Sequence, residues 1–162
     1  MKTQFRYNLP IESNFILEIK EKAPAHKLEF SKINPKIYFD ITNAIDFICQ
    51  LNTPIKAALS GEVIKIQHND KKCNSYISDL NQDEEDGNYI ILKHEFNNKI
   101  EFSIYSHLNK ILVKKGDFVN TGDIIGQSGD SGWSILPHLH FMVFVFGSPF
   151  PSEQSLEINW NK

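Results

Sequence analysis

The 162-residue chain has no apolar run close to the roughly 18 residues that a membrane-spanning helix needs, so we expect no membrane span. It also has no cluster of lysine and arginine, because its 17 basic and 20 acidic residues are interspersed and leave a net charge of −3. Phosphate binding needs clustered positive charge, so the composition argues against a nucleic-acid partner. The first residues show neither the apolar core nor the small-residue cleavage site of a secretory signal peptide.

Cysteine is scarce, and glycine is unevenly distributed along the chain. The two cysteines, Cys49 and Cys73, cannot form a disulfide scaffold, so stability must come from packing, although one pair between them stays possible. Cys49 lies in an apolar run and is predicted to be a small buried side chain. Glycine is absent from the first 60 residues, and all eight glycines fall between Gly61 and Gly147.

The rest of the sequence is strand-like. With 41% hydrophobic residues, the chain can bury one core and is too short for two ordinary domains. Apolar residues alternate with polar ones, or form short β-branched and aromatic runs, at residues 61–66, 89–92, 100–105 and 139–146. The pattern predicts an all-β fold with a compact antiparallel sheet core, in which a hairpin joins the second and third of these runs.

The domain organisation follows from the same patterns. We expect residues 1–36 to be an N-terminal extension packed on the core, residues 37–150 to be the β core, and residues 151–162 to be a C-terminal tail. Within the extension, residues 14–19 alternate and are predicted to form a strand. Residues 41–51 fit helical spacing yet are rich in β-branched side chains, so periodicity alone leaves that segment ambiguous.

Two histidines two residues apart, His138 and His140, are the clearest chemical signal. In a strand such residues project from the same face, about 7 Å apart along the chain, so both can reach one site. Imidazole is a common metal ligand and a proton carrier near neutral pH. Two unrelated strand histidines are the plainer interpretation of this short motif.

Two further residues strengthen the case for a site. His107 follows a predicted strand and precedes a turn. Asp46 lies in an apolar stretch, where an unpaired charge would cost several kcal/mol, so it needs a cation or several hydrogen-bond donors. Capping of backbone amides by Asp46 is the alternative.

For four other histidine and aromatic residues we predict surface, core or groove-border positions. His68 and His94 are predicted to be surface residues at strand ends. Trp133 and Tyr105 are candidates for the border of a groove, with core packing as the alternative.

The order of these blocks resembles the lysostaphin-like, LytM-type zinc metallopeptidase family. The blocks that carry the resemblance are residues 43–47, 52–63, 87–91, 105–108, 116–126, 129–132 and 137–141. The resemblance implies the duplicated hybrid motif fold, a compact antiparallel sheet with a groove over its concave face. It also implies substrates among the peptides of bacterial peptidoglycan and work outside the cytoplasm.

The resemblance also implies roles for individual residues. Asp46 and His140 occupy zinc-ligand positions, and His107 and His138 occupy the positions of histidines that line the catalytic water. Zinc with three protein ligands and an open position would polarise the scissile carbonyl, while a neighbouring histidine moves a proton.

One ligand of the family pattern is missing. The family has another histidine shortly before the aspartate, most often four residues before it, where this chain has Thr42. His26, Asp40 and Asn34 are the candidates for a third donor, and without one the site would be weak or empty.

Three functions therefore compete. The first is a zinc-dependent endopeptidase of cell-wall peptides, expected to be a monomer. The second is an inactive family member that binds peptidoglycan or a partner protein through the same groove. The third is a carrier or sugar phosphotransfer domain, suggested by the glycine pattern at residues 116–126. A carrier needs a lysine at an exposed hairpin tip, which we do not find, and the histidine pair argues against phosphotransfer.

Overall fold

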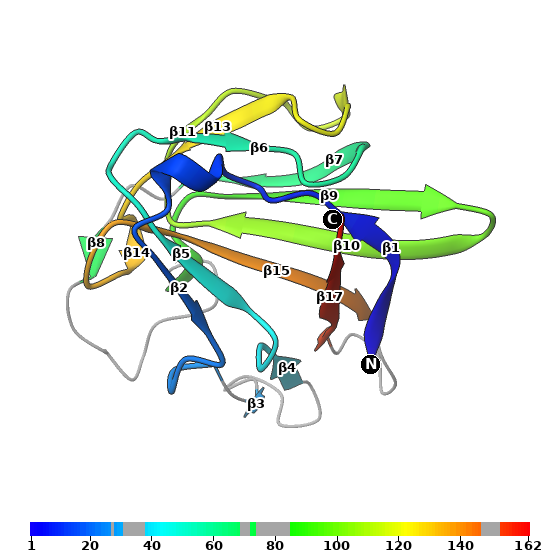
Figure 1. The fold of residues 1–162 in the computed structure, drawn as a ribbon, viewed down its shortest axis with the longest axis horizontal. Helices are drawn as coiled ribbons and strands as arrows, with labels where there is room; N and C mark the ends of the chain where they lie inside the picture. The colour runs from blue at the N-terminus through cyan, green and yellow to red at the C-terminus, as the bar shows by residue number, and fades with distance from the viewer. Residues whose placement is uncertain (27, 31–37, 69–71, 74–84, 147–152) are drawn as a thin grey trace.

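The computed structural model describes residues 1–26, 28–30, 38–68, 72–73, 85–146 and 153–162, and β-strands dominate it (Figure 1). This confirms the predicted all-β antiparallel fold. The elements are β1 (Lys2–Tyr7), a 3₁₀ turn η1 (Ser13–Phe15), β2 (Glu18–Glu21), β3 (Leu28–Phe30), β4 (Tyr38–Asp40), β5 (Ile45–Ile48), β6 (Pro54–Lys56), β7 (Gly61–Gln67), β8 (Lys72–Cys73), β9 (Tyr89–Phe96), β10 (Lys99–Ser106), β11 (Leu108–Ile111), β12 (Phe118–Val119), β13 (Ile124–Ser128), β14 (Gly132–Trp133), β15 (His138–Phe146), β16 (Glu153–Ser155) and β17 (Glu157–Trp160).

The main sheet is built around the β9–β10 hairpin and β15. Its strand order is β12-β7-β9-β10-β15-β16-β4-β3, and β5 also pairs with β15 and carries β2 on its other side. Figure 1 shows the long hairpin in green, with β15 running beside it in orange. The hairpin turns at Asn97 and Asn98, both with positive φ (49° and 61°), a conformation that asparagine tolerates. The predicted hairpin is therefore confirmed.

The two faces of β15 have different roles because successive side chains of a strand point to opposite faces. Leu139, Phe141 and Val143 pack into the main hydrophobic core and are fully buried. His138, His140 and the residues that continue their row lie on the other face. There Met142 and Phe144 belong to a second, smaller apolar cluster.

The N-terminal segment is tied to the core by strand pairing. β1 pairs in parallel with β17, and β2 pairs antiparallel with β5. The predicted strand at residues 14–19 is wrong in its position, since a 3₁₀ turn occupies Ser13–Phe15 and β2 begins at Glu18. The contact with β5 begins at Leu17, whose N–H donates to the Ile48 carbonyl, and continues through β2.

The ambiguous segment at residues 41–51 contains a strand, β5, with no helix. β5 lies between β15 and β2, where its β-branched and aromatic side chains fit a pleated surface. Cys49, just after β5, is buried as predicted. No helix in the described residues is long and apolar enough to cross a membrane.

His94 is a correction, because it is 1% exposed and does not lie on the surface. Its Nδ1 donates to the Ser60 carbonyl at 2.9 Å, and its Nε2 is 2.8 Å from Ser103 Oγ. Since a carbonyl only accepts, Nδ1 carries the proton and Nε2 accepts from the hydroxyl. Burial lowers the pKa of His94 to about 4. Tyr105, the suggested groove residue, is likewise in the core, where its hydroxyl accepts from Ala58 N–H.

Candidate metal centre

The ladder between β5 and β15 brings the first two predicted ligands together. His140 lies directly opposite Asp46 in this antiparallel pair. Side chains of directly opposed residues share a face and lie within contact distance. His140 Nδ1 is 2.9 Å from Asp46 Oδ1, so the sheet itself fixes this pair.

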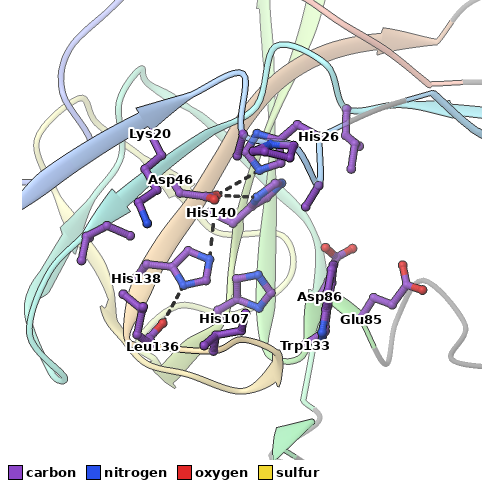
Figure 2. A pocket seen from close by; sticks show the side chains of 16 residues that line it. Lys20, His26, Asp46, Glu85, Asp86, His107, Trp133, Leu136, His138 and His140 are labelled. Carbon is purple, nitrogen blue, oxygen red and sulfur yellow. Dashed lines mark hydrogen bonds and ion pairs between the residues drawn. The ribbon is translucent and has the colours of Figure 1, made fainter. Parts of the chain in front are cut away.

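His26 joins the pair from the segment after β2. Its Nε2 is 3.2 Å from Asp46 Oδ1, and its ring packs edge-on against His140 with centroids 5.0 Å apart. One ligand atom from each of the three residues lies within 4.8 Å of the other two. Two imidazoles and a carboxylate form one donor cluster (Figure 2).

The backbone before His26 turns the ring inward. Lys22 has a positive φ of 52°, and His26 N–H donates to the Ala23 carbonyl at 2.8 Å. The His26 side chain is only 4% exposed. Its Nδ1 is buried and has no hydrogen-bond partner among the described residues, a costly arrangement for a polar atom that has nothing to bind.

The cluster is strongly coupled electrostatically. Burial by itself would raise the pKa of Asp46, but hydrogen bonds from His140 and His26, together with the charges of His140 and His138, hold that pKa well below its usual range. Burial would lower the pKa of His140, yet its hydrogen bond to Asp46 and the charge of that carboxylate raise it. Asp46 is therefore an anion whose charge faces the imidazoles, as a metal-binding carboxylate requires.

His107 and His138 flank the cluster and are held differently. His107 Nδ1 is 2.8 Å from the Ser131 carbonyl, and His138 Nδ1 is 2.8 Å from the Leu136 carbonyl. Each Nδ1 must donate, which leaves Nε2 as the unprotonated nitrogen of a neutral ring. The two ring centroids are 4.6 Å apart.

The surroundings favour these neutral rings. Burial lowers the pKa of His107, and the charges of His138 and His140 lower it further. Burial also lowers the pKa of His138, against the opposing effect of the Asp46 carboxylate. His138 Nε2 is 3.8 Å from Asp46 Oδ1, farther than the nitrogens of His26 and His140.

Tightly packed turns position His107. Its φ is +62°, in the left-handed region, and its N–H donates to the Asp86 carbonyl at 3.0 Å. Gly132, with φ +71°, lies against the Glu85 carbonyl and Gly87 N so closely that no Cβ fits there. Glycine at this position lets the loop carrying Ser131 reach His107.

A pocket of about 380 Å³ lies over the cluster. Its walls come from residues 23–25 and 135–136, with Trp133, a predicted groove residue, confirmed on its border. Glu85 and Asp86 stand on one side and Lys20 on another (Figure 2). Sequence reasoning did not anticipate Lys20 as a pocket residue, since it belongs to no recognisable motif.

Among the described residues, Asp40 is the other candidate for the third donor, and it is not part of the cluster. Asp40 accepts hydrogen bonds from Thr42 N–H and Oγ1–H at 3.1 and 2.6 Å, and so caps its own turn. Asn34 lies outside the described residues. His68 is exposed, as predicted.

Comparison with known proteins matches this architecture to a family. Residues 40–151 match peptidase family M23. The chain belongs to that family. The match includes Asp46, His107, His138 and His140, whereas His26 lies outside it.

Individual M23 peptidases are similar in sequence and fold. The peptidoglycan DD-endopeptidase ShyB of Vibrio cholerae is 31% identical over 131 residues, which are 77% of this chain and 27% of that protein. The catalytic domain of lysostaphin from Staphylococcus simulans superposes with a TM-score of 0.57 at 28% identity, covering 85% of this chain and 87% of that domain. A zinc-containing peptidase from Vibrio cholerae gives a TM-score of 0.57 at 25% identity, covering 86% of this chain and 36% of that one.

The chain matches only 17% to 28% of the length of the first curated relatives. A metal is implied by membership of a metallopeptidase family, and the residues present fit one. The donor set of two imidazoles and a carboxylate is typical of catalytic zinc, and the described residues offer no hydrogen-bond partner to the buried Nδ1 of His26.

Proposed function

We propose that this chain is a zinc-dependent endopeptidase that cleaves peptides of bacterial peptidoglycan, with zinc held by His26, Asp46 and His140. The observation that carries the proposal is the convergence of these three donors beneath a pocket that two further histidines line. Relatives named as peptidoglycan endopeptidases support the substrate class.

The third donor bears on the choice between an active and an inactive family member. Inactivity was the alternative because Thr42 stands where the family has a histidine. His26, 3.2 Å from the same carboxylate oxygen, provides the missing imidazole from another part of the chain. The position of His26 therefore favours the active peptidase.

A bound zinc ion supplies Lewis-acid polarisation of the scissile carbonyl. The chain's own residues do the remaining work. Nε2 of His138 or His107 accepts the proton of the attacking water and returns it to the leaving amine, because Nδ1 of each ring is engaged with a backbone carbonyl. These carbonyl contacts keep the basic nitrogen of both rings on the pocket side.

The test is hydrolysis of purified peptidoglycan and of synthetic cross-linked stem peptides, followed by mass spectrometry. We expect new peptide termini, loss of cleavage on chelation, and recovery when zinc is returned. Chelator-resistant cleavage would contradict the zinc mechanism. Absence of cleavage by zinc-loaded protein would contradict the peptidase assignment.

A further inference from the structure

A basic side chain faces the pocket next to the donor cluster. Lys20 lies directly opposite Asp46 in the β2–β5 ladder, so the two side chains share a face of the sheet. Of the described residues that line the pocket, Lys20 is the one lysine or arginine. Figure 2 shows it on the Asp46 side of the cluster.

Lys20 forms its ion pair with a residue outside the donor cluster. Its ion pair is with Glu18, at 3.7 Å, and the two side chains are 43% and 60% exposed. Exposed pairs of this kind contribute little to stability. Lys20 can therefore exchange Glu18 for another carboxylate at little cost. The groups that hold the pKa of Asp46 low are histidines: His140, His26 and His138.

The opposite side of the pocket is acidic. Glu85 and Asp86 line it there, beyond His107 in Figure 2. Apolar side chains of Ile41, Ile48 and Leu136 make up much of the remaining wall. A negatively charged group on a bound peptide is repelled from the Glu85 side and attracted to Lys20, so the pocket distinguishes the two directions along its length.

We propose that Lys20 is a specificity residue whose ammonium group binds a free carboxylate of the peptide substrate close to the bond that is cut. This rests on the proposed function and narrows it to peptides with a side-chain or terminal carboxylate on the β2 side of the pocket. A carboxamide at the same position accepts a hydrogen bond but lacks the charge, so it binds less tightly.

The test compares two fluorescent cell-wall peptides that are identical except that a free side-chain carboxylate in one is a carboxamide in the other. Binding is followed by fluorescence anisotropy in zinc-loaded protein carrying His107→Ala, which slows turnover. We expect the carboxylate peptide to bind about threefold to tenfold more tightly, with a preference that shrinks as salt rises. Lys20→Gln should bring the preference to about one, whereas Lys20→Arg should keep most of it.

Lys115→Gln is the matched control, because Lys115 is exposed and does not line the pocket. It should retain the full preference. A preference that survives Lys20→Gln, or equal binding of both peptides before that change, overturns the role of Lys20 and leaves the peptidase proposal standing. If neither peptide binds and neither is cleaved by the unmutated protein, both proposals fall.

Discussion

The two faces of the central sheet both carry buried histidines, and the difference between them distinguishes structure from chemistry. On the core face, His94 has both ring nitrogens hydrogen-bonded, to Ser60 and Ser103. On the pocket face, Nδ1 of His107 and of His138 donates to a backbone carbonyl and Nε2 makes no hydrogen bond to another described residue, while Nδ1 of His26 has no partner there. Burial alone therefore does not mark a functional histidine. What distinguishes it is a ring nitrogen that remains available to bind a metal or to accept a proton.

The largest expected effect is on the donors fixed by the sheet. Asp46→Ala and His140→Ala should each lower zinc affinity by more than about 100-fold, because loss of a ligand costs more than the 10–100-fold typical of residues that only support ligands. Peptide hydrolysis should fall below detection. Equilibrium dialysis with elemental analysis measures the first effect. Asp40→Asn, outside the cluster, is the control and should bind zinc normally. A variant of Asp46 that binds zinc as tightly as the unmutated protein would break the account.

The next effect separates the flanking histidines from the donors. His107→Ala and His138→Ala should each reduce kcat by about 10²–10⁴-fold, the usual contribution of a general acid–base group. Zinc content should stay near one per chain, since these rings lie outside the donor cluster. Steady-state kinetics and elemental analysis on the same samples give both values. Loss of zinc from His107→Ala would show that the division of roles is wrong.

The third effect concerns the donor supplied by the N-terminal segment. His26→Ala should weaken zinc binding by at least about 10-fold, and by less than loss of Asp46 or His140, because the β5–β15 ladder still holds those two donors in place. Zinc should also slow proteolytic cleavage within residues 18–26 of the unmutated protein, because the ion would join that segment to β5 and β15. The protection should vanish in His26→Ala and persist in the exposed control His68→Ala. Equal protection in all three proteins would place the third ligand elsewhere.

The smallest effect on the site is expected from the core face. The native state resists protonation of His94, whose pKa is about 4, while the unfolded chain takes up a proton near pH 6.5. Stability from neutral His94 is therefore complete above pH 6.5 and falls by about 3 kcal/mol as the pH drops to 4. His94→Gln should remove this part of the pH dependence, measured by urea unfolding at several pH values, and leave zinc affinity unchanged. Identical pH dependence of the two proteins would contradict the burial of a neutral His94.

The sequence predicted the part of the site that local geometry determines. The spacing of His138 and His140 places both on one face of any strand, and an aspartate in an apolar run needs a partner. The family resemblance added the fold and the proposed roles of Asp46 and His107. These inferences depend only on periodicity and on the order of blocks.

The sequence did not fix His26 because its position depends on long-range pairing. It lies 20 residues before Asp46 and reaches that residue only because β2 pairs with β5 and the chain then turns at Lys22. The prediction that His94 lies on the surface is wrong for a related reason. β9 extends to Phe96, so His94 is inside the strand, opposite Glu101, with its side chain in the core.

The most direct test of the account is a calorimetric titration of metal-free protein with zinc, compared with His26→Ala and the matched His68→Ala. The account predicts one site tighter than about 1 μM, unchanged in His68→Ala and at least tenfold weaker in His26→Ala. No tight site in the unmutated protein, or a tight site unaffected by the loss of His26, would contradict a zinc centre assembled from His26, Asp46 and His140.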